Sequence, residues 1–85
     1  MIKMIIKQFQ AGDFEITLYE YSENKKVMYR NVYTLGVRGK GTFIYEVSDE
    51  KSEAMQVYKK VIMYIKESHF KNEEITLNDI VEHLK

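Results

Sequence analysis

The sequence contains no cysteine, no proline and no tryptophan, and it has only two histidines. Without cysteine, the chain has no disulfide, no thiolate nucleophile and no cysteine-based zinc site. The two histidines, His69 and His83, have no second ligand at a spacing typical of metal sites. We therefore expect no metal site and no cofactor.

The chain also lacks an excess of charge of either sign, because 13 basic and 13 acidic side chains cancel. Proteins dedicated to binding duplex nucleic acid usually carry a basic excess. Lysines interrupt the apolar residues at the start of the chain, so we expect neither a signal peptide nor a membrane span. The sequence is typical of a cytoplasmic protein with no membrane partner.

No set of residues matches a known catalytic arrangement. Ser68 and His69 are neighbours in sequence, but adjacent residues on a helix point about 100° apart, so they do not form a nucleophile and base pair. The acidic residues at 46–53 fit the start of a helix, where the helix dipole favours negative charge. The glycines at 36–41 fit a hairpin turn, and no helix follows Lys40 as it does in a phosphate-binding loop. We expect a protein that is not an enzyme and has no catalytic residue.

Residues 48–70 form the longest segment with a helical period. Apolar side chains fall on one side, and lysine, glutamate and glutamine take the other. Ser48 or Asp49 is expected to cap its first amides. The pattern predicts a long amphipathic helix whose apolar face packs on a sheet, with these residues facing inward: Ala54, Val57, Tyr58, Val61, Ile62 and Ile65.

Three segments have the alternation of β-strands, at residues 14–21, 27–38 and 42–47. Polar residues at 22–26 and glycines at 39–41 predict the turns between them. Because these loops are short, the strands are expected to be neighbours in an antiparallel meander. The helix at 48–70 would cover the face that carries Phe14, Ile16 and Leu18.

The two ends of the chain have helical patterns of their own. Apolar residues within 2–10 recur at i, i+3, i+4 and i+7, which predicts a short helix that stops at Gly12. The alternative is a strand that pairs back through residues 11–13. Near the C-terminus, Thr76 with Asp79 has the pattern of a helix cap and predicts a short closing helix.

The predicted fold is therefore a single α+β domain, residues 1–85. It has a three-stranded antiparallel meander sheet packed by a long amphipathic helix, with a short N-terminal helix and a short C-terminal helix. A chain of this length buries only about 60–65% of its unfolded surface. A homodimer is one way to bury more.

The second face of the predicted sheet is the candidate binding surface. Tyrosine, methionine and arginine are enriched at protein interfaces, and aromatic residues near arginine also suit stacking on single-stranded bases. The alternative is that the first or last helix covers this face. The predicted partner-binding residues are Tyr19, Tyr21, Arg30, Arg38 and Lys40.

The predicted order α-β-β-β-α is that of double-stranded-RNA-binding domains. It departs from their motif, because Asp49, Glu50 and Glu53 stand where those domains have a lysine cluster. The order, the polar hairpins and the acidic start of the long helix also resemble small phage-encoded anti-CRISPR proteins. Those proteins act without catalysis by occupying the surface of a nuclease, although the DNA mimics among them carry strong negative charge and this chain does not.

The abundance of isoleucine, lysine, glutamate, tyrosine and asparagine is typical of AT-rich coding, which favours a bacterial or phage source. We expect a protein-binding module that inhibits a host nucleic-acid-handling complex, such as a CRISPR nuclease, with a host or phage protein as its partner. The alternative is a weak nucleic-acid-binding domain that uses the tyrosines and arginines on the second face of the sheet.

Overall fold

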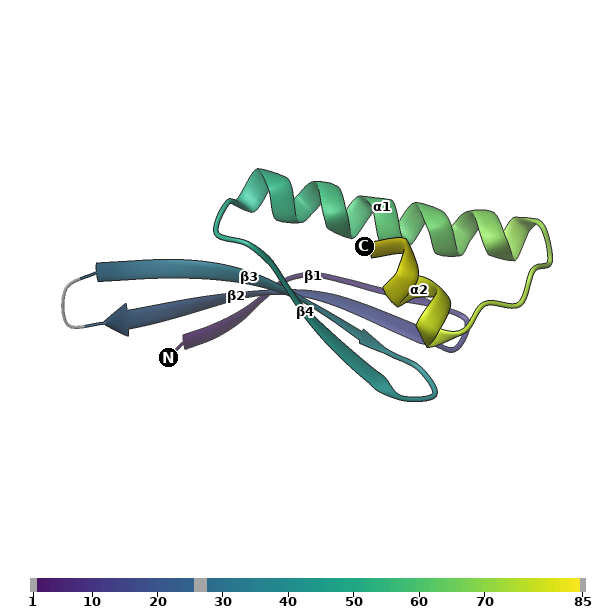
Figure 1. Cartoon of the computed structure of the whole chain (residues 1–85), viewed down its shortest axis with the longest axis horizontal. Coiled ribbons are helices and arrows are strands. Elements are labelled where there is room, and N and C mark those ends of the chain that lie inside the picture. The colour runs from purple at the N-terminus through teal and green to yellow at the C-terminus, as the bar shows by residue number, and fades with distance from the viewer. Residues whose placement is uncertain (1, 26–27, 85) are drawn as a thin grey trace.

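The computed structural model describes the backbone of residues 2–25 and 28–84 and the side chains of residues 3–22 and 32–84. Within this part the chain forms strands β1 (Ile2–Ala11), β2 (Phe14–Lys25), β3 (Met28–Arg38) and β4 (Thr42–Ser48), followed by helices α1 (Lys51–Phe70) and α2 (Leu77–Leu84). The strands make one antiparallel sheet in the order β1-β2-β3-β4. Both helices lie on the same side of this sheet (Figure 1).

The predicted α+β class, antiparallel sheet, long helix and short C-terminal helix are confirmed. The predicted number of strands is wrong, because the described sheet has four strands instead of three. The predicted N-terminal helix is also wrong, because β1 occupies its place. The strand that pairs back through residues 11–13 is the arrangement that forms.

A bulge in β1 explains why Ile6 and Phe9, three positions apart, both pack against the core. The pairing of β1 with β2 shifts register between Ile5 and Lys7, and both Ile6 and Phe9 pack against the core. A bulge adds one residue to one strand and changes the phase of its alternation. Apolar side chains three positions apart can then face the same layer, as they do on a helix.

The β2–β3 hairpin is longer than the sequence predicts. β2 continues to Lys25, through most of the turn expected at 22–26, and pairs with β3 as far as Met28. Residues 26 and 27 lie outside the described part of the chain. The element order is β-β-β-β-α-α, so the α-β-β-β-α order on which both resemblances were based is not the order of this chain.

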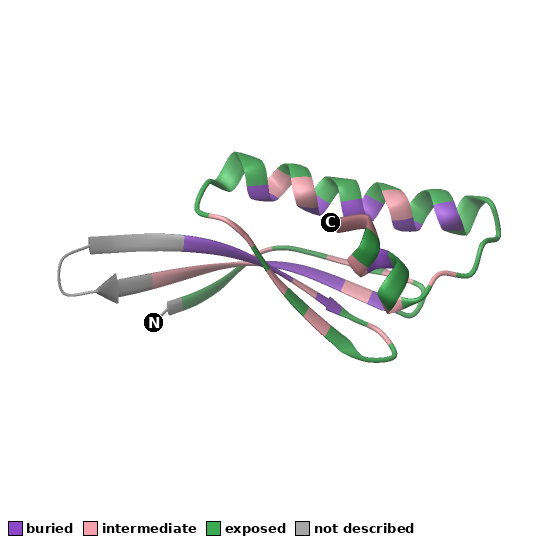
Figure 2. Ribbon diagram, viewed as in Figure 1, coloured by how far each residue is buried: buried purple, intermediate pink, exposed green. Residues whose placement is uncertain are grey.

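α1 lies along the sheet and packs its apolar side across all four strands (Figure 2). The core combines this helix with the inward side chains of the strands and with Ile80 of α2. Val57 is only half-buried, whereas Ser68 is buried and was not predicted to be. The fully buried or nearly buried side chains of α1 are Ala54, Tyr58, Val61, Ile62, Ile65 and Ser68.

The two helices begin in different ways. α1 starts three residues later than predicted, with no side-chain cap, and the Ser48 hydroxyl instead accepts a hydrogen bond from the Glu50 amide at 3.0 Å. The predicted cap of α2 is present: the Thr76 amide donates to Asp79 Oδ2 at 2.8 Å, and the Asp79 amide donates to Thr76 Oγ1 at 3.2 Å. These reciprocal bonds satisfy amides that the helix itself leaves free.

Candidate functional site

Neither α1 nor α2 covers the second face of the sheet, which we call the open face (Figure 1). Directly opposed residues of antiparallel strands share a face, so the register identifies its members. Toward the helices, the sheet carries Phe14, Ile16 and Leu18 of β2. The open face is formed by Lys3, Ile5, Gln8, Gln10, Glu15, Thr17, Tyr19, Tyr21, Val32, Thr34, Gly36, Arg38, Thr42, Ile44 and Glu46.

Two tyrosines of β2 and a lysine of β1 form a cluster on the open face. The Lys3 ammonium lies 4.1 Å from the centroid of the Tyr19 ring and 5.9 Å from that of Tyr21. The two ring centroids are 6.2 Å apart, with the planes tilted by 49°. A cation over the face of an aromatic ring is attracted by the ring quadrupole, so Lys3 holds both rings in place.

The Tyr19 ring lies close against the sheet because Gly36 leaves room for it. A methyl group at Gly36 would lie 3.1 Å from Tyr19 Cε2, which is closer than ordinary van der Waals contact. Thr17 is only 2% exposed although no helix covers it, and Thr34 and Val32 are buried as well. Side chains of the open face itself therefore shield the middle of the sheet.

Part of the open face forms a hollow of about 230 Å³. Pockets that enclose a small molecule usually have volumes of about 300–1,000 Å³. This hollow is smaller, so it suits contact with a protein surface better than enclosure of a ligand. Its lining consists of Lys3, Glu15, Thr17, Tyr19, Tyr21, Gly36, Val37, Arg38, Thr42 and Ile44.

The structure brings together three of the five predicted partner-binding residues. Tyr19, Tyr21 and Arg38 line the hollow. Lys40 does not line the hollow and lies in the β3–β4 turn, where the glycines at 39–41 predict it, with a φ of 53°. The side chain of Arg30 lies outside the described residues.

Sequence reasoning missed Lys3 as a member of this face. The error follows from the predicted N-terminal helix, which placed Lys3 on a solvent-exposed helix side. As a strand, β1 pairs Lys3 with Tyr21 and brings its ammonium over the tyrosines. If residues 2–10 are read as a strand that pairs with residues 14–21, Lys3 falls beside Tyr21, and this pairing could have identified it.

Among the described residues, no group of three or more histidine, cysteine or acidic side chains is placed to hold a metal ion. The Ser68 hydroxyl donates to the Tyr64 carbonyl at 2.9 Å and is buried. The His83 ring stacks on Tyr64, with centroids 4.2 Å apart and planes within 9° of parallel. These side chains have structural partners that account for their positions.

A larger hollow, of about 430 Å³, lies at the end of α1 beside the β1–β2 turn. Apolar side chains such as Phe9, Phe14 and Ile65 line it, and the Lys66 ammonium lies 5.1 Å from the Phe9 ring centroid. Its one buried hydroxyl, that of Ser68, is already bonded within α1. Charged side chains also line the hollow, among them Asp13, Lys66, His69, Glu73 and Glu74.

Comparison of the chain with protein-family models, curated proteins and solved structures finds no match. In the described part of the chain, neither helix is long and apolar enough to cross a membrane.

Proposed function

We propose that this protein is a non-enzymatic module that binds a partner protein through the open face of its sheet. The observation that carries the proposal is the cluster of Lys3, Tyr19 and Tyr21 on a sheet face that neither α1 nor α2 covers. Tyrosine and arginine are the residue types that most often dominate the energy of protein interfaces. A face of this composition is suited to burial against another protein.

The cluster also reduces the entropic cost of binding. Ordering a flexible side chain at an interface costs about 0.5–1.5 kcal/mol. Tyr19 is already confined by Gly36 beneath it and by the Lys3 ammonium above its ring. Much of this ordering is therefore complete before a partner arrives.

The residues of the open face define the chemistry of the partner. Tyr19, Tyr21 and the 67% exposed Ile44 favour an apolar centre, and Arg38 at the end of β3 favours a carboxylate opposite it. The partner is thus a protein surface with an apolar centre and an acidic edge. We predict that the partner belongs to a host nucleic-acid-handling complex and that binding inhibits this complex.

The test is a comparison of two double variants in a binding assay. The immobilised protein is incubated with lysate of an AT-rich bacterial host, and a retained protein is then purified and titrated by calorimetry. We expect Tyr21→Ala with Arg38→Ala to weaken this binding at least tenfold. The matched control is Met4→Ala with Lys51→Ala, which removes an apolar and a basic side chain that are exposed away from the open face.

If both double variants bind as the parent does, the open face is not the binding surface. Circular dichroism of each variant separates loss of binding from loss of folding. Failure to retain any protein from several hosts would also count against the proposal.

A second function, weak binding of single-stranded nucleic acid, is favoured by the same tyrosines with Lys3 and Arg38 nearby. Glu15 and Glu46 on this face oppose it, because they repel phosphates. A salt titration of oligonucleotide binding distinguishes the two functions. Phosphate contacts give a steep decrease of log affinity with log salt concentration, whereas we expect no measurable binding even at low salt.

A further inference from the structure

The side of α1 that points away from the sheet carries two exposed apolar side chains. Met63 is 68% exposed and Phe70 is 88% exposed. They lie seven residues apart, which places them on nearly the same line along the helix. Figure 2 shows this outer side of α1 as largely exposed, while the buried residues lie on the side toward the sheet.

Basic side chains surround these two residues. Lys59, Lys60 and Lys71 are exposed, while the Lys66 ammonium is directed toward the Phe9 ring. Glu67 is the one acidic residue between positions 56 and 71. The chain as a whole has no net charge. The outer side of α1 is therefore a local basic patch that the overall composition conceals.

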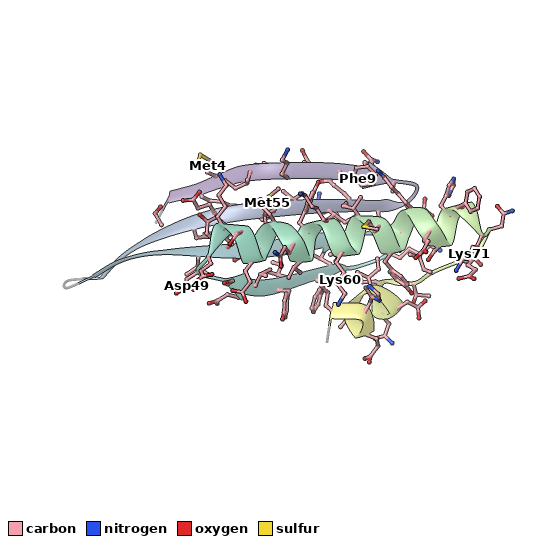
Figure 3. All side chains as sticks on the ribbon, turned by 90° about the horizontal axis from the view of Figure 1, so that it is seen from above. Met4, Phe9, Asp49, Met55, Lys60 and Lys71 are labelled. Atoms are coloured by element: carbon pink, nitrogen blue, oxygen red, sulfur yellow. The ribbon has the colours of Figure 1, made fainter. Side chains whose placement is uncertain are left out.

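A hollow of about 350 Å³ adjoins this patch, between α1 and α2. The stacked rings of Tyr64 in α1 and His83 in α2 connect the two helices beside this hollow. Figure 3 places Lys60 on the side of α1 that faces α2. The residues that line the hollow are Gln56, Lys59, Lys60, Met63, Tyr64, Glu67 and His83.

We propose that the outer side of α1 binds an acidic segment of a partner protein. An apolar side chain of that segment occupies the hollow against Met63 and Tyr64, and its carboxylates face Lys59 and Lys60. Opposite charges across an interface raise the association rate and fix the orientation of the partner. This surface lies on the opposite side of the molecule from the open face, so the proposal does not depend on the function proposed above.

The acidic residues at both ends of α1 favour a short segment over an anionic membrane. Asp49 and Glu50 precede the helix, and Glu73 and Glu74 follow it. Figure 3 shows Asp49 near the start of α1 and Lys71 at its far end. A flat anionic surface along the helix would approach both acidic groups, whereas a short segment can contact the lysines between them.

Two synthetic peptides test the proposal by nuclear magnetic resonance. Each has about 15 residues, with leucine at a helical spacing, so that one side is apolar whenever the peptide forms a helix. One peptide has glutamate at all other positions, and the second has lysine at those positions. We expect the acidic peptide to shift the amide signals of residues 56–70 and of His83, with affinity that falls as salt is added, and the basic peptide to shift none of them.

A pair of charge reversals distinguishes the local patch from overall charge. Lys59→Glu with Lys60→Glu should weaken binding of the acidic peptide at least tenfold. Lys7→Glu with Lys51→Glu changes the net charge by the same amount at exposed sites outside the patch, and it should weaken binding less than twofold. Tyr21→Ala with Arg38→Ala should leave this binding unchanged, which separates it from binding at the open face.

The proposal is overturned if the acidic peptide at millimolar concentration shifts no signal of α1, or if the basic peptide binds equally well. Equal weakening by the two charge reversals would also overturn it, because the effect would then be one of net charge. Sedimentation with phosphatidylcholine vesicles, with and without one-fifth phosphatidylserine by composition, tests the membrane. Binding to the anionic vesicles without binding to the peptide would assign the patch to lipid.

Discussion

The two faces of the β-sheet exclude water in different ways. On the covered face, α1 and α2 bury apolar side chains such as Ile16, Leu18 and Leu35 completely. On the open face, Tyr19 and Lys3 lie over the central strands and shield small residues such as Thr17. A sheet face that no helix packs against can therefore still exclude water, if its long side chains lie flat on it. Such side chains remain accessible, so the face that is shielded in this way can also bind.

The largest expected effect compares two isoleucines on opposite faces. Ile16 is 0% exposed on the covered face, and Ile44 is 67% exposed on the open face. Ile16→Ala should lower the free energy of unfolding by about 2–5 kcal/mol, because it leaves a cavity in the core. Ile44→Ala should change it by no more than about 0.5 kcal/mol. Urea denaturation followed by circular dichroism measures both, and similar losses would mean that the open face is buried in solution.

A second comparison uses two glycines of the same stretch. At Gly39, an added methyl group would lie 2.6 Å from the Asp13 carbonyl oxygen, so the backbone must move. Gly39→Ala should therefore destabilise the protein by about 1–3 kcal/mol. At Gly36 only the Tyr19 ring must move, and Gly36→Ala should cost less than about 1 kcal/mol while it lowers affinity for the partner. Equal destabilisation by the two substitutions would show that the Tyr19 ring is not free to adjust.

Two buried tyrosines, Tyr33 of β3 and Tyr58 of α1, predict the pH dependence of stability. Burial raises the pKa of Tyr33 above its ordinary value of 10.0, with a smaller contribution from the negative charge of Glu20, and burial alone raises the pKa of Tyr58. The folded state thus binds these two protons more tightly than the unfolded state does. Their contribution to stability is complete below about pH 10 and is lost as pH rises through the raised pKa values.

Alkaline denaturation monitored by tyrosine absorbance at several pH values measures this effect. Tyr33→Phe with Tyr58→Phe should reduce the loss of stability between pH 9 and pH 11. The matched substitution on the open face, Tyr19→Phe with Tyr21→Phe, provides the comparison. If it reduces the loss as much as the first pair does, the alkaline sensitivity does not come from the two buried tyrosines.

The smallest expected effect concerns the cation over the open-face tyrosines. Lys3→Ala should lower the free energy of unfolding by about 0.5–1 kcal/mol, the range for an exposed cation over an aromatic ring. Lys66→Ala should cost less, because Lys66 lies 5.1 Å from one ring whereas Lys3 lies near two. Thermal unfolding of both variants provides the comparison, and a larger loss for Lys66→Ala would contradict the described geometry.

The parts of the fold that were predicted correctly have strong local patterns. The end of α1 at Phe70, its inward apolar face and the Thr76–Asp79 cap all follow from residues close together in sequence. The alternation in β2 also placed Tyr19 and Tyr21 on the face opposite Phe14 and Ile16. The glycines at 39–41 likewise placed Lys40 in the turn between β3 and β4.

The N-terminal segment was predicted wrongly because its pattern fits two structures. The spacing of its isoleucines and Phe9 suits one side of a helix, and it also suits a strand with a bulge. The sequence of this segment alone does not decide between the two structures. A helix of about ten residues is only marginally stable by itself, so contacts with the rest of the chain determine which one forms. Pairing with β2 decides between them, and that pairing also determines the position of Lys3.

The sequence by itself determined the long amphipathic helix, the two-residue alternation of the central strands and the absence of cysteine chemistry, because these depend on neighbouring residues. Only the tertiary structure decided that residues 2–11 are a strand, that both helices share one side of the sheet, and that Lys3 lies over Tyr19 and Tyr21. The physical reason is that a strand gains its hydrogen bonds from a partner elsewhere in the chain, so its formation depends on contacts that no local pattern contains.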